Sequence, residues 1–331
     1  MVVGENGHGK TNLLEALAWL ATLSSFRGAP NDALVRQGAE RAYVRAQVGR
    51  AGRAVLIEAE LPPRGSPRVL VNGSALRRST DLLGALRVSV FSPDDLTLVK
   101  GGPAHRRDLL DDALVAIAPR HAETRTAVER VLKQRGALLR QAGGKATPEI
   151  VSTLDVWDAK LAEHGAALVA ARRELVSTLE PLVAKAYAAV AAGAAPITLR
   201  YVPSWEGELH AALTAARTDD LRRGVTTLGP HRDELELHIG PLPARTHASQ
   251  GEQRSLALAL RLAVHHAVTE ATDSAPILLL DDVFSELDPI RSSALVAALP
   301  AGQAILTTAG ALPPGATPAA TVRISQGRIA S

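Results

Sequence analysis

The octapeptide Gly4-Glu5-Asn6-Gly7-His8-Gly9-Lys10-Thr11 fits the phosphate-binding pattern G-x-x-x-x-G-K-[ST]. Its glycines let backbone N–H groups turn toward phosphate oxygens, where a side chain would collide. Lys10 would place a positive charge on the β- and γ-phosphates, and Thr11 would offer its hydroxyl to Mg²⁺. The following segment 12–20 predicts a helix whose positive end faces the anion. The pattern therefore predicts a nucleotide-phosphate site between a strand and a helix.

The composition is that of a folded protein without special covalent chemistry. The 331 residues are 46% hydrophobic and 21% charged, and none is cysteine, which excludes disulfides, cysteine-ligated zinc and thiol catalysis. The sequence lacks a signal-peptide pattern, and no uncharged apolar run approaches the roughly 18 residues that span a bilayer. The net charge of +3 is too small to indicate a nucleic-acid partner by itself. We expect a cytoplasmic protein with no membrane partner.

Hydrophobic periodicity predicts α/β segments on both sides of a helical middle. Apolar residues at three- and four-residue spacing predict helices over 121–141 and 151–191, separated by a Gly/Pro-containing break. We expect one discontinuous head formed by 1–105 and 193–331, with 106–192 as an inserted helical subdomain. Further helices are expected over 250–269 and 290–299. Strands are expected over 41–48, 53–61 and 67–71 as an antiparallel meander, and over 87–91, 225–239, 277–281, 304–308 and 321–324.

A second candidate half of the nucleotide site follows the apolar run Ile277-Leu278-Leu279-Leu280. Such a run is typical of a central parallel strand, and ligands bind at the carboxyl ends of such strands. Asp281 would hold Mg²⁺, and Asp282 would orient or deprotonate the attacking water. The alternative is a buried strand followed by a helix N-cap. The phosphate-binding loop in the same chain favours the metal-binding interpretation.

Ser249-Gln250-Gly251-Glu252-Gln253 begins a predicted helix and offers a serine with free N–H groups at its positive end. The chain would then hold two phosphate-binding surfaces but the metal-binding residues for one nucleotide. We expect a dimer in which the second surface closes on the partner's nucleotide. The alternative is an ordinary helix N-cap. Ser285-Glu286-Leu287-Asp288, followed by Pro289, is by itself a helix-starting turn.

These motifs together resemble a known family. The set 4–11, 249–253, 278–282 and 285–288 resembles the ABC-type ATPase heads of the SMC and recombination-repair class. Further segments are similar to the RecF pattern: Phe91-Ser92-Pro93-Asp94-Asp95-Leu96, Gly102-Pro103, Arg106-Arg107-Asp108-Leu109-Leu110-Asp111, Gln134-Arg135-Gly136-Ala137-Leu138-Leu139, Leu154-Asp155-Val156-Trp157 and Gly229-Pro230-His231-Arg232-Asp233-Glu234-Leu235.

The resemblance implies an α/β ABC-type ATPase head, with a P-loop parallel core sheet and an antiparallel meander, and an inserted helical arm that straddles DNA. It implies a weak, DNA-stimulated ATPase that uses ATP and Mg²⁺ and forms an ATP-dependent homodimer. Such a dimer binds double-stranded DNA and junctions of single- and double-stranded DNA. It helps RecO and RecR to load RecA in gap repair, replication restart and the SOS response.

The resemblance also assigns roles to residues of this sequence. Catalytic roles fall to Lys10, Asp281 and Asp282, and metal binding to Thr11 and Asp281. Nucleotide contacts fall to Gly4, Asn6, Gly7, Gly9, Lys10, Thr11 and Asn12. Ser249, Gln250 and Gly251 act in trans on the γ-phosphate, Asp288 is the dimer-loop aspartate, and Thr307-Thr308, with Thr308 in the site, is the switch position.

Three departures from the family pattern qualify these roles. Family members carry a strand and loop before the phosphate-binding loop, so we expect a misassigned start or a truncated product. Glu252 stands where glutamine is more usual. Asp282 stands where most ABC ATPases have glutamate, and its shorter side chain predicts slow turnover.

Basic side chains of the helical middle are candidates for contacts with the DNA backbone. Helical spacing between 130 and 140 could follow a phosphate backbone, whereas a solvated face balanced by Glu123 and Glu129 is the alternative. The competing functions are an SMC-like head, a transporter ATPase subunit and a small-molecule P-loop kinase. The candidate side chains are Arg106, Arg107, Arg120, Arg125, Arg130, Lys133, Arg135, Arg140, Arg222 and Arg223.

Overall fold

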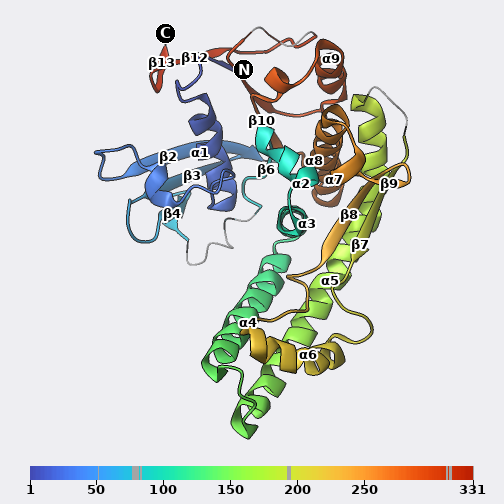
Figure 1. Cartoon of the computed structure of the whole chain (residues 1–331). Coiled ribbons are helices and arrows are strands. Elements are labelled where there is room, and N and C mark those ends of the chain that lie inside the picture. Colours follow the sequence, from blue (N-terminus) through green and yellow to red (C-terminus); the bar gives the residue numbers. More distant parts are fainter. Residues whose placement is uncertain are drawn as a thin grey trace. The chain divides into compact units, whose positions relative to one another are not determined.

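The structure is a computed structural model, and it describes residues 1–50, 52–76, 82, 84–191, 195–310, 312 and 315–330. The chain separates into two compact units (Figure 1). The first unit comprises Met1–Leu96, Lys185–Ala194 and Arg254–Ser331, and the second comprises Thr97–Ala184 and Ala195–Gln253. The phosphate-binding loop belongs to the first unit.

A six-stranded sheet forms the centre of the first unit, in the order β13-β12-β1-β11-β10-β6. All neighbours pair in parallel except β12 and β13, which are antiparallel. Strand β11 lies between β1 and β10, so the carboxyl ends of the two motif-bearing strands meet at one edge. The strands are β1 (Val2–Val3), β6 (Val88–Phe91), β10 (Ile277–Asp281), β11 (Ala304–Thr308), β12 (Val322–Ser325) and β13 (Arg328–Ala330). The strands predicted over 87–91, 277–281, 304–308 and 321–324 are confirmed.

Helix α1 (Lys10–Thr22) leaves the phosphate-binding loop and packs on this sheet. Its Leu14 and Ala18 share a buried cluster with Leu279 of β10, which is why the apolar run 277–280 is a central strand. The other helical elements with residues in the first unit are η1 (Asn31–Leu34), η3 (Pro93–Asp95), the first residue of α2 (Leu96–Lys100), the end of α5 (Pro148–Val190), α8 (Gln250–Thr272), η4 (Val283–Glu286) and α9 (Pro289–Ala298). Helices α8 and α9 confirm the predictions over 250–269 and 290–299.

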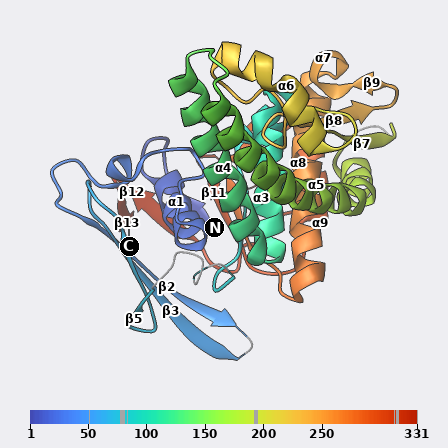
Figure 2. The ribbon, with the colours of Figure 1, turned by 90° about the horizontal axis from the view of Figure 1, so that it is seen from below.

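An antiparallel meander, ordered β2-β3-β4-β5, forms a second sheet of the first unit (Figure 2). Ile57, Ala59 and Leu61 alternate toward the core, where they cluster with Trp19 and Leu20 of α1. The predicted meander is confirmed, and a short fourth strand is added. The strands are β2 (Ala42–Arg50), β3 (Arg53–Leu61), β4 (Arg68–Val71) and β5 (Ser74–Ala75).

The second unit combines long helices with a small antiparallel sheet, ordered β7-β8-β9. The helices predicted over 121–141 and 151–191 are confirmed as α4 and α5, and Gly143 ends α4 at a φ of 55°. The other elements are α2 (Leu96–Lys100), α3 (Pro103–Ile117), α6 (Leu209–Arg223), α7 (Ala244–His247), β7 (Ile197–Val202), β8 (Glu234–Ile239) and β9 (Leu242–Pro243); α4 and α5 span Arg120–Ala142 and Pro148–Val190.

The second unit departs from the sequence predictions in two respects. The strand expected over 225–239 begins only at Glu234, so its first half was wrong. Side chains hold residues 226–233 instead: the Thr227 N–H donates to Asp220, the Gly229 N–H donates to Ser204 Oγ, and Asp233 accepts from Tyr201 and from the Ser204 N–H. The unit also includes β7 to β9, so its bounds are wider than the helical subdomain 106–192; the sequence did not indicate β7 or α6.

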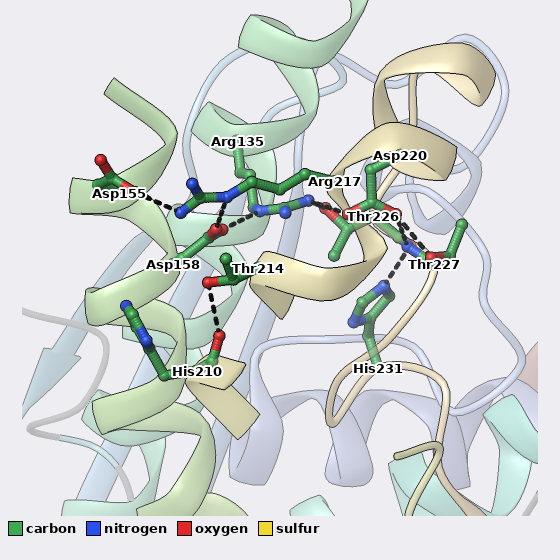
Figure 3. A network of polar contacts seen from close by, with 10 residues as sticks. All are labelled: Arg135, Asp155, Asp158, His210, Thr214, Arg217, Asp220, Thr226, Thr227 and His231. Atoms are coloured by element: carbon green, nitrogen blue, oxygen red, sulfur yellow. Dashed lines mark hydrogen bonds and ion pairs between the residues drawn. The ribbon is translucent and has the colours of Figure 1, made fainter. Parts of the chain in front are cut away.

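A buried ionic network joins three helices of the second unit (Figure 3). Arg135 of α4 pairs with Asp158 of α5 and Asp220 of α6, each at 2.7 Å, and it donates to Thr226 Oγ1 at 2.9 Å. Arg217 of α6 pairs with the same Asp158 at 2.7 Å. Arg135, Asp158 and Asp220 are fully buried. The network therefore fixes the mutual arrangement of α4, α5 and α6.

Candidate nucleotide-binding site

The glycines of the phosphate-binding loop have separate reasons to be glycine. A Cβ on Gly4 would lie 2.2 Å from the Ile324 carbonyl oxygen of β12. Gly7 and Gly9 have φ values of 79° and 97°, which side-chain-bearing residues rarely adopt. A Cβ on Gly7 would meet no atom within 4 Å. Glycine lets the loop adopt this turn and the close approach to β12, and the space beside Gly7 is open, as a phosphate-binding loop requires.

Lys10 is a buried cation without an acidic partner. The residue is 7% exposed, and among the described residues Nζ donates to the Gly4 and Glu5 carbonyl oxygens alone, at 2.8 and 3.0 Å. Within the described part of the chain no carboxylate pairs with it. Gly9, the N-cap of α1, supplies no side-chain acceptor for the first N–H groups of the helix. A buried charge beside unpaired N–H groups fits an anionic ligand such as a phosphate.

Thr11 and Asp281 meet although they are 270 positions apart. Thr11 Oγ1 donates to Asp281 Oδ1 at 2.9 Å, and the Asp281 side chain is 6% exposed at the end of β10. A hydroxyl and a carboxylate in contact, next to a phosphate-binding loop, match the donors that a nucleotide-bound Mg²⁺ takes from a protein. The residues present therefore fit the predicted metal site.

Asp282 follows in a left-handed backbone conformation, with φ 48° and ψ 27°. Its N–H donates to Thr307 Oγ1 at 3.0 Å, and its carbonyl accepts from Ser285 Oγ at 2.8 Å. Among the described residues, none forms a hydrogen bond or ion pair with its carboxylate. That carboxylate follows Asp281 at the same sheet edge, where it could orient a water molecule.

The remaining nucleotide contacts expected in the first unit occupy varied positions. Thr308 is buried, lies beside Val3 in the sheet register and accepts from the Gly310 N–H at 3.1 Å. Asn6 and Asn12 are exposed on the loop and on the first turn of α1. Asp288 caps α9 by accepting from the Arg291 N–H at 2.9 Å, and this hydrogen bond lowers its pKa. Its role between two protomers stays a prediction.

Ser249, Gln250 and Gly251 belong to the second unit, at the start of α8. Ser249 N–H and Oγ–H both donate to Glu252 Oε2 at 2.7 Å. The Glu252 N–H returns a longer bond to Ser249 Oγ at 3.3 Å. This is a capping box, so the unusual Glu252 is explained locally as a helix cap. The action of Ser249 on a partner's nucleotide stays a prediction.

Several candidate DNA contacts interact with other residues of the chain. Arg135 is fully buried between Asp158 and Asp220. Arg106 is also buried and forms a bidentate pair with Glu234, with both bonds at 2.8 Å. Three further candidates have ionic partners: Arg125 pairs with Asp112 and Glu129, and Arg222 and Arg223 pair with Asp219. Arg107 donates to the Asp233 carbonyl oxygen at 2.7 Å.

The exposed candidates that remain lie on α4. Arg130, Lys133 and Arg140 form no ion pair with any described residue, and Arg120 is exposed at the start of the helix. At 100° per residue the first three span an arc of about 80°. One face of α4 therefore carries three free cations. The buried Arg135 shares the register of Val131 and Leu139, both buried, and this i−4, i+4 spacing was the signal that could have separated it from the exposed set.

Comparison with known proteins gives a consistent result. The model of the RecF/RecN/SMC N-terminal domain matches residues 1–308. A DNA replication and repair protein RecF from Streptomyces avermitilis is 47% identical over 323 residues, covering 93% of this chain and 86% of the relative. A RecF from Frankia alni is 47% identical over 329 residues with the same coverage.

Solved structures agree with the sequence relatives. The recombination mediator protein RecF of the RecFOR pathway, in its RecF-ATP form, matches with a TM-score of 0.91 and 30% identity, covering 99% of this chain and 90% of that chain. An Smc head bound to the winged-helix domain of ScpA matches with a TM-score of 0.55 at 18% identity, which shows the shared fold alone. The α/β fold of an ABC-type ATPase head, expected from the motifs, is confirmed. With this coverage by the family model and by close relatives, the chain belongs to the RecF family of DNA replication and repair proteins.

Proposed function

We propose that the chain is an ATP-dependent recombination mediator that binds duplex DNA near single-strand gaps. The observation that carries the ATP part is the meeting of Thr11 and Asp281 at 2.9 Å, beside the unpaired cation of Lys10. The solved relatives described as RecF-ATP and RecF-ATPrS support the same ligand. Cytoplasmic location is part of this proposal; the described part of the chain contains no helix long and apolar enough to cross a membrane.

The residues of the site divide the work of ATP hydrolysis. Lys10 exchanges its two carbonyl acceptors for β- and γ-phosphate oxygens, and the N–H groups of the loop hold the same phosphates. Mg²⁺ held by Thr11 and Asp281 would neutralise charge on the phosphate oxygens. Asp282 orients the attacking water and accepts its proton. Because aspartate is one methylene shorter than glutamate, we expect slow turnover that suits a switch.

The dimer in this proposal is completed by the other unit of each chain. Ser249, Gln250 and Gly251 lie at the start of α8, where the Ser249 hydroxyl would exchange its bond to Glu252 for one to an anion. Facing the γ-phosphate of a partner, they would make dimerisation depend on ATP. Asp288 would contact the partner near the same nucleotide. Hydrolysis would then separate the protomers.

DNA binding is supported by the exposed cations of α4. Arg130, Lys133 and Arg140 project from one face and suit the evenly spaced charges of a phosphate backbone, without base readout. Preference for junctions between single- and double-stranded DNA, DNA-stimulated hydrolysis, and cooperation with RecO and RecR in loading RecA come from the RecF relationship.

Size-exclusion chromatography with ATP and Mg²⁺ tests the proposal. We expect an ATP-dependent dimer for the parent chain and a monomer for Lys10→Arg. The Ser249→Arg variant should bind ATP and remain monomeric. Ser177→Arg introduces the same charge at an exposed site of the second unit and should dimerise normally. A parent chain that stays monomeric with ATP, or a Ser249→Arg variant that dimerises, would contradict the trans role.

A further inference from the structure

Thr307 connects the two aspartates of the proposed ATP site, through the carboxylate of Asp281 and the backbone N–H of Asp282. It lies on β11, between the loop-bearing β1 and the Asp281-bearing β10, and its side chain is fully buried. We propose that Thr307 is a positioning residue for hydrolysis: its hydroxyl fixes the metal-binding carboxylate of Asp281 and the backbone of Asp282 together. This inference rests on the proposed ATPase function and adds a residue to it.

The contact with Asp281 leaves one carboxylate oxygen available. Asp281 Oδ1 accepts from Thr11 Oγ1 and from Thr307 Oγ1, both at 2.9 Å. Among the described residues, none donates to Asp281 Oδ2. Thr11 is itself a proposed metal ligand, so its hydroxyl must adapt to the cation. Thr307 is not a ligand and sits in the sheet opposite Asp281, so it can hold the carboxylate whether or not the cation is bound.

The contact with Asp282 maintains an unfavourable backbone. A φ of 48° is uncommon for a residue with a side chain and persists only where neighbours enforce it. The Thr307 oxygen accepts the Asp282 N–H at 3.0 Å, and Ser285 binds the Asp282 carbonyl from the other side. Loss of the Thr307 hydroxyl would let this peptide relax and would move the Asp282 carboxylate away from the position at which it orients water.

One hydroxyl thus performs two tasks, because it donates to a carboxylate and accepts from the next residue's N–H. Among the described residues, Thr11 and Thr307 are the two side chains that donate to the Asp281 carboxylate. The role differs from packing in a testable way. Thr307→Val keeps the branched shape and removes the hydroxyl, whereas Thr307→Ser keeps the hydroxyl and removes a methyl group. A positioning role predicts a higher kcat for Thr307→Ser than for Thr307→Val, and a packing role predicts the reverse.

The experiment measures kcat and KM for ATP, and the Mg²⁺ concentration that half-maximally raises the Tm in the presence of a non-hydrolysable ATP analogue. For Thr307→Val we expect kcat to fall about 10- to 100-fold and the Mg²⁺ midpoint to rise about tenfold, because supporting residues of metal sites have effects of this size. KM should change little at saturating Mg²⁺. Thr307→Ser should retain most of the parent kcat and Mg²⁺ midpoint. Thr269→Val, which removes a hydroxyl bonded within α8, is the matched control and should behave like the parent.

The outcomes separate this inference from the proposed function. If Thr307→Val matches the parent in kcat and Mg²⁺ midpoint while Thr307→Ser is impaired, Thr307 is a packing residue and the inference is wrong. If the parent chain itself neither binds nor hydrolyses ATP, both the proposed function and the inference fail. Should Thr307→Val not fold, Thr307→Ser and Thr307→Ala repeat the comparison with a difference of one oxygen atom, and equal kcat values for that pair would overturn the inference.

Discussion

Lys10 of the first unit and Arg135 of the second are both buried cations, but their partners differ. Among the residues that the structure describes, Lys10 donates only to two backbone carbonyls of its own loop. Arg135 donates to the carboxylates of Asp158 and Asp220 and to a threonine hydroxyl (Figure 3). Removing a charge from water costs several kcal/mol unless a counter-charge is supplied. The chain supplies that counter-charge for Arg135 and leaves it to a ligand for Lys10.

The difference separates a binding site from a structural network. Around Lys10, the loop glycines leave open space, and the site gathers N–H groups, a hydroxyl and carboxylates at the end of strands. Around Arg135, three helices close on a network whose charges are balanced internally. A buried cation therefore indicates a ligand site when carboxylates of the chain do not pair with it, and a structural role when they do.

Removal of Arg135 should have the largest effect. Arg135→Met leaves the Asp158 and Asp220 carboxylates buried without this partner, so the second unit should lose about 3–5 kcal/mol of unfolding free energy. Arg130→Met, on the exposed face of the same helix, should stay within about 0.5 kcal/mol of the parent. Urea denaturation monitored by circular dichroism measures both. Equal stabilities for the two variants would show that the network is not structural.

Asp281→Asn should impair the site without unfolding its unit. The amide oxygen can still accept from Thr11 and Thr307, but it carries no charge for a cation. We expect ATP hydrolysis to fall about a hundredfold. Phosphate release measures hydrolysis, and the Tm serves as the control for folding. An unchanged rate at limiting Mg²⁺ would remove Asp281 from the metal site.

Acid should weaken each unit through one buried histidine. The pKa values of His231 in the second unit and of His265 in the first are lowered from 6.5 to about 4, mainly by burial; the cations Arg232, Arg107 and Arg135 contribute to the lowering at His231. Above pH 6.5 neither folded nor unfolded chains bind these protons. Between pH 6.5 and 4 the unfolded state protonates first, so the unfolding free energy falls as the pH falls.

Denaturation at pH 7.5 and at pH 5 tests this pair. The slope of the unfolding free energy against pH reflects how many more protons the unfolded chain binds than the folded chain. Replacing either histidine with glutamine should reduce that difference by up to one proton. A dependence identical to that of the parent would mean that the replaced ring is not held neutral in the folded state.

The exposed cations of α4 should give the smallest effect. Replacing Arg130, Lys133 and Arg140 with glutamine should make the plot of the logarithm of the duplex-binding constant against the logarithm of the salt concentration less steep. The slope should change by about 2 to 3, since each phosphate contact contributes about 0.9. Fluorescence anisotropy over a range of salt concentrations measures the slope. Arg222→Gln with Arg223→Gln, which removes cations already paired with Asp219, is the control. A slope unchanged in the triple variant would place DNA elsewhere.

The same contrast explains what could be predicted from the sequence. The loop 4–11 and the run 277–282 are contiguous motifs whose chemistry depends on local order, so their meeting across 270 positions followed from the topology of a parallel sheet. The role of Arg135 depends on Asp158 and Asp220, which are far away in the sequence; its i−4 and i+4 spacing to Val131 and Leu139 could have indicated burial, but not these partners. The family resemblance places Thr307 at the switch position, whereas its hydrogen bonds to Asp281 and Asp282 are visible only in three dimensions. Residues 225–233 were predicted as part of one strand with 234–239. The side-chain hydrogen bonds that hold them in another conformation leave no pattern in the local sequence.

Equilibrium binding of ATP tests most directly that Lys10 is the cation whose counter-charge comes from a ligand. Calorimetric titration of the parent chain and of Lys10→Met with ATP and Mg²⁺ gives the affinity, and denaturation without nucleotide gives the stability. We expect Lys10→Met to bind ATP at least about tenfold more weakly, as loss of a charge-assisted contact to phosphate requires. Without nucleotide it should be as stable as the parent or more stable, because a buried charge with no carboxylate partner has been removed. Undiminished ATP affinity, or a loss of stability as large as that expected for Arg135→Met, would contradict the distinction between the two cations.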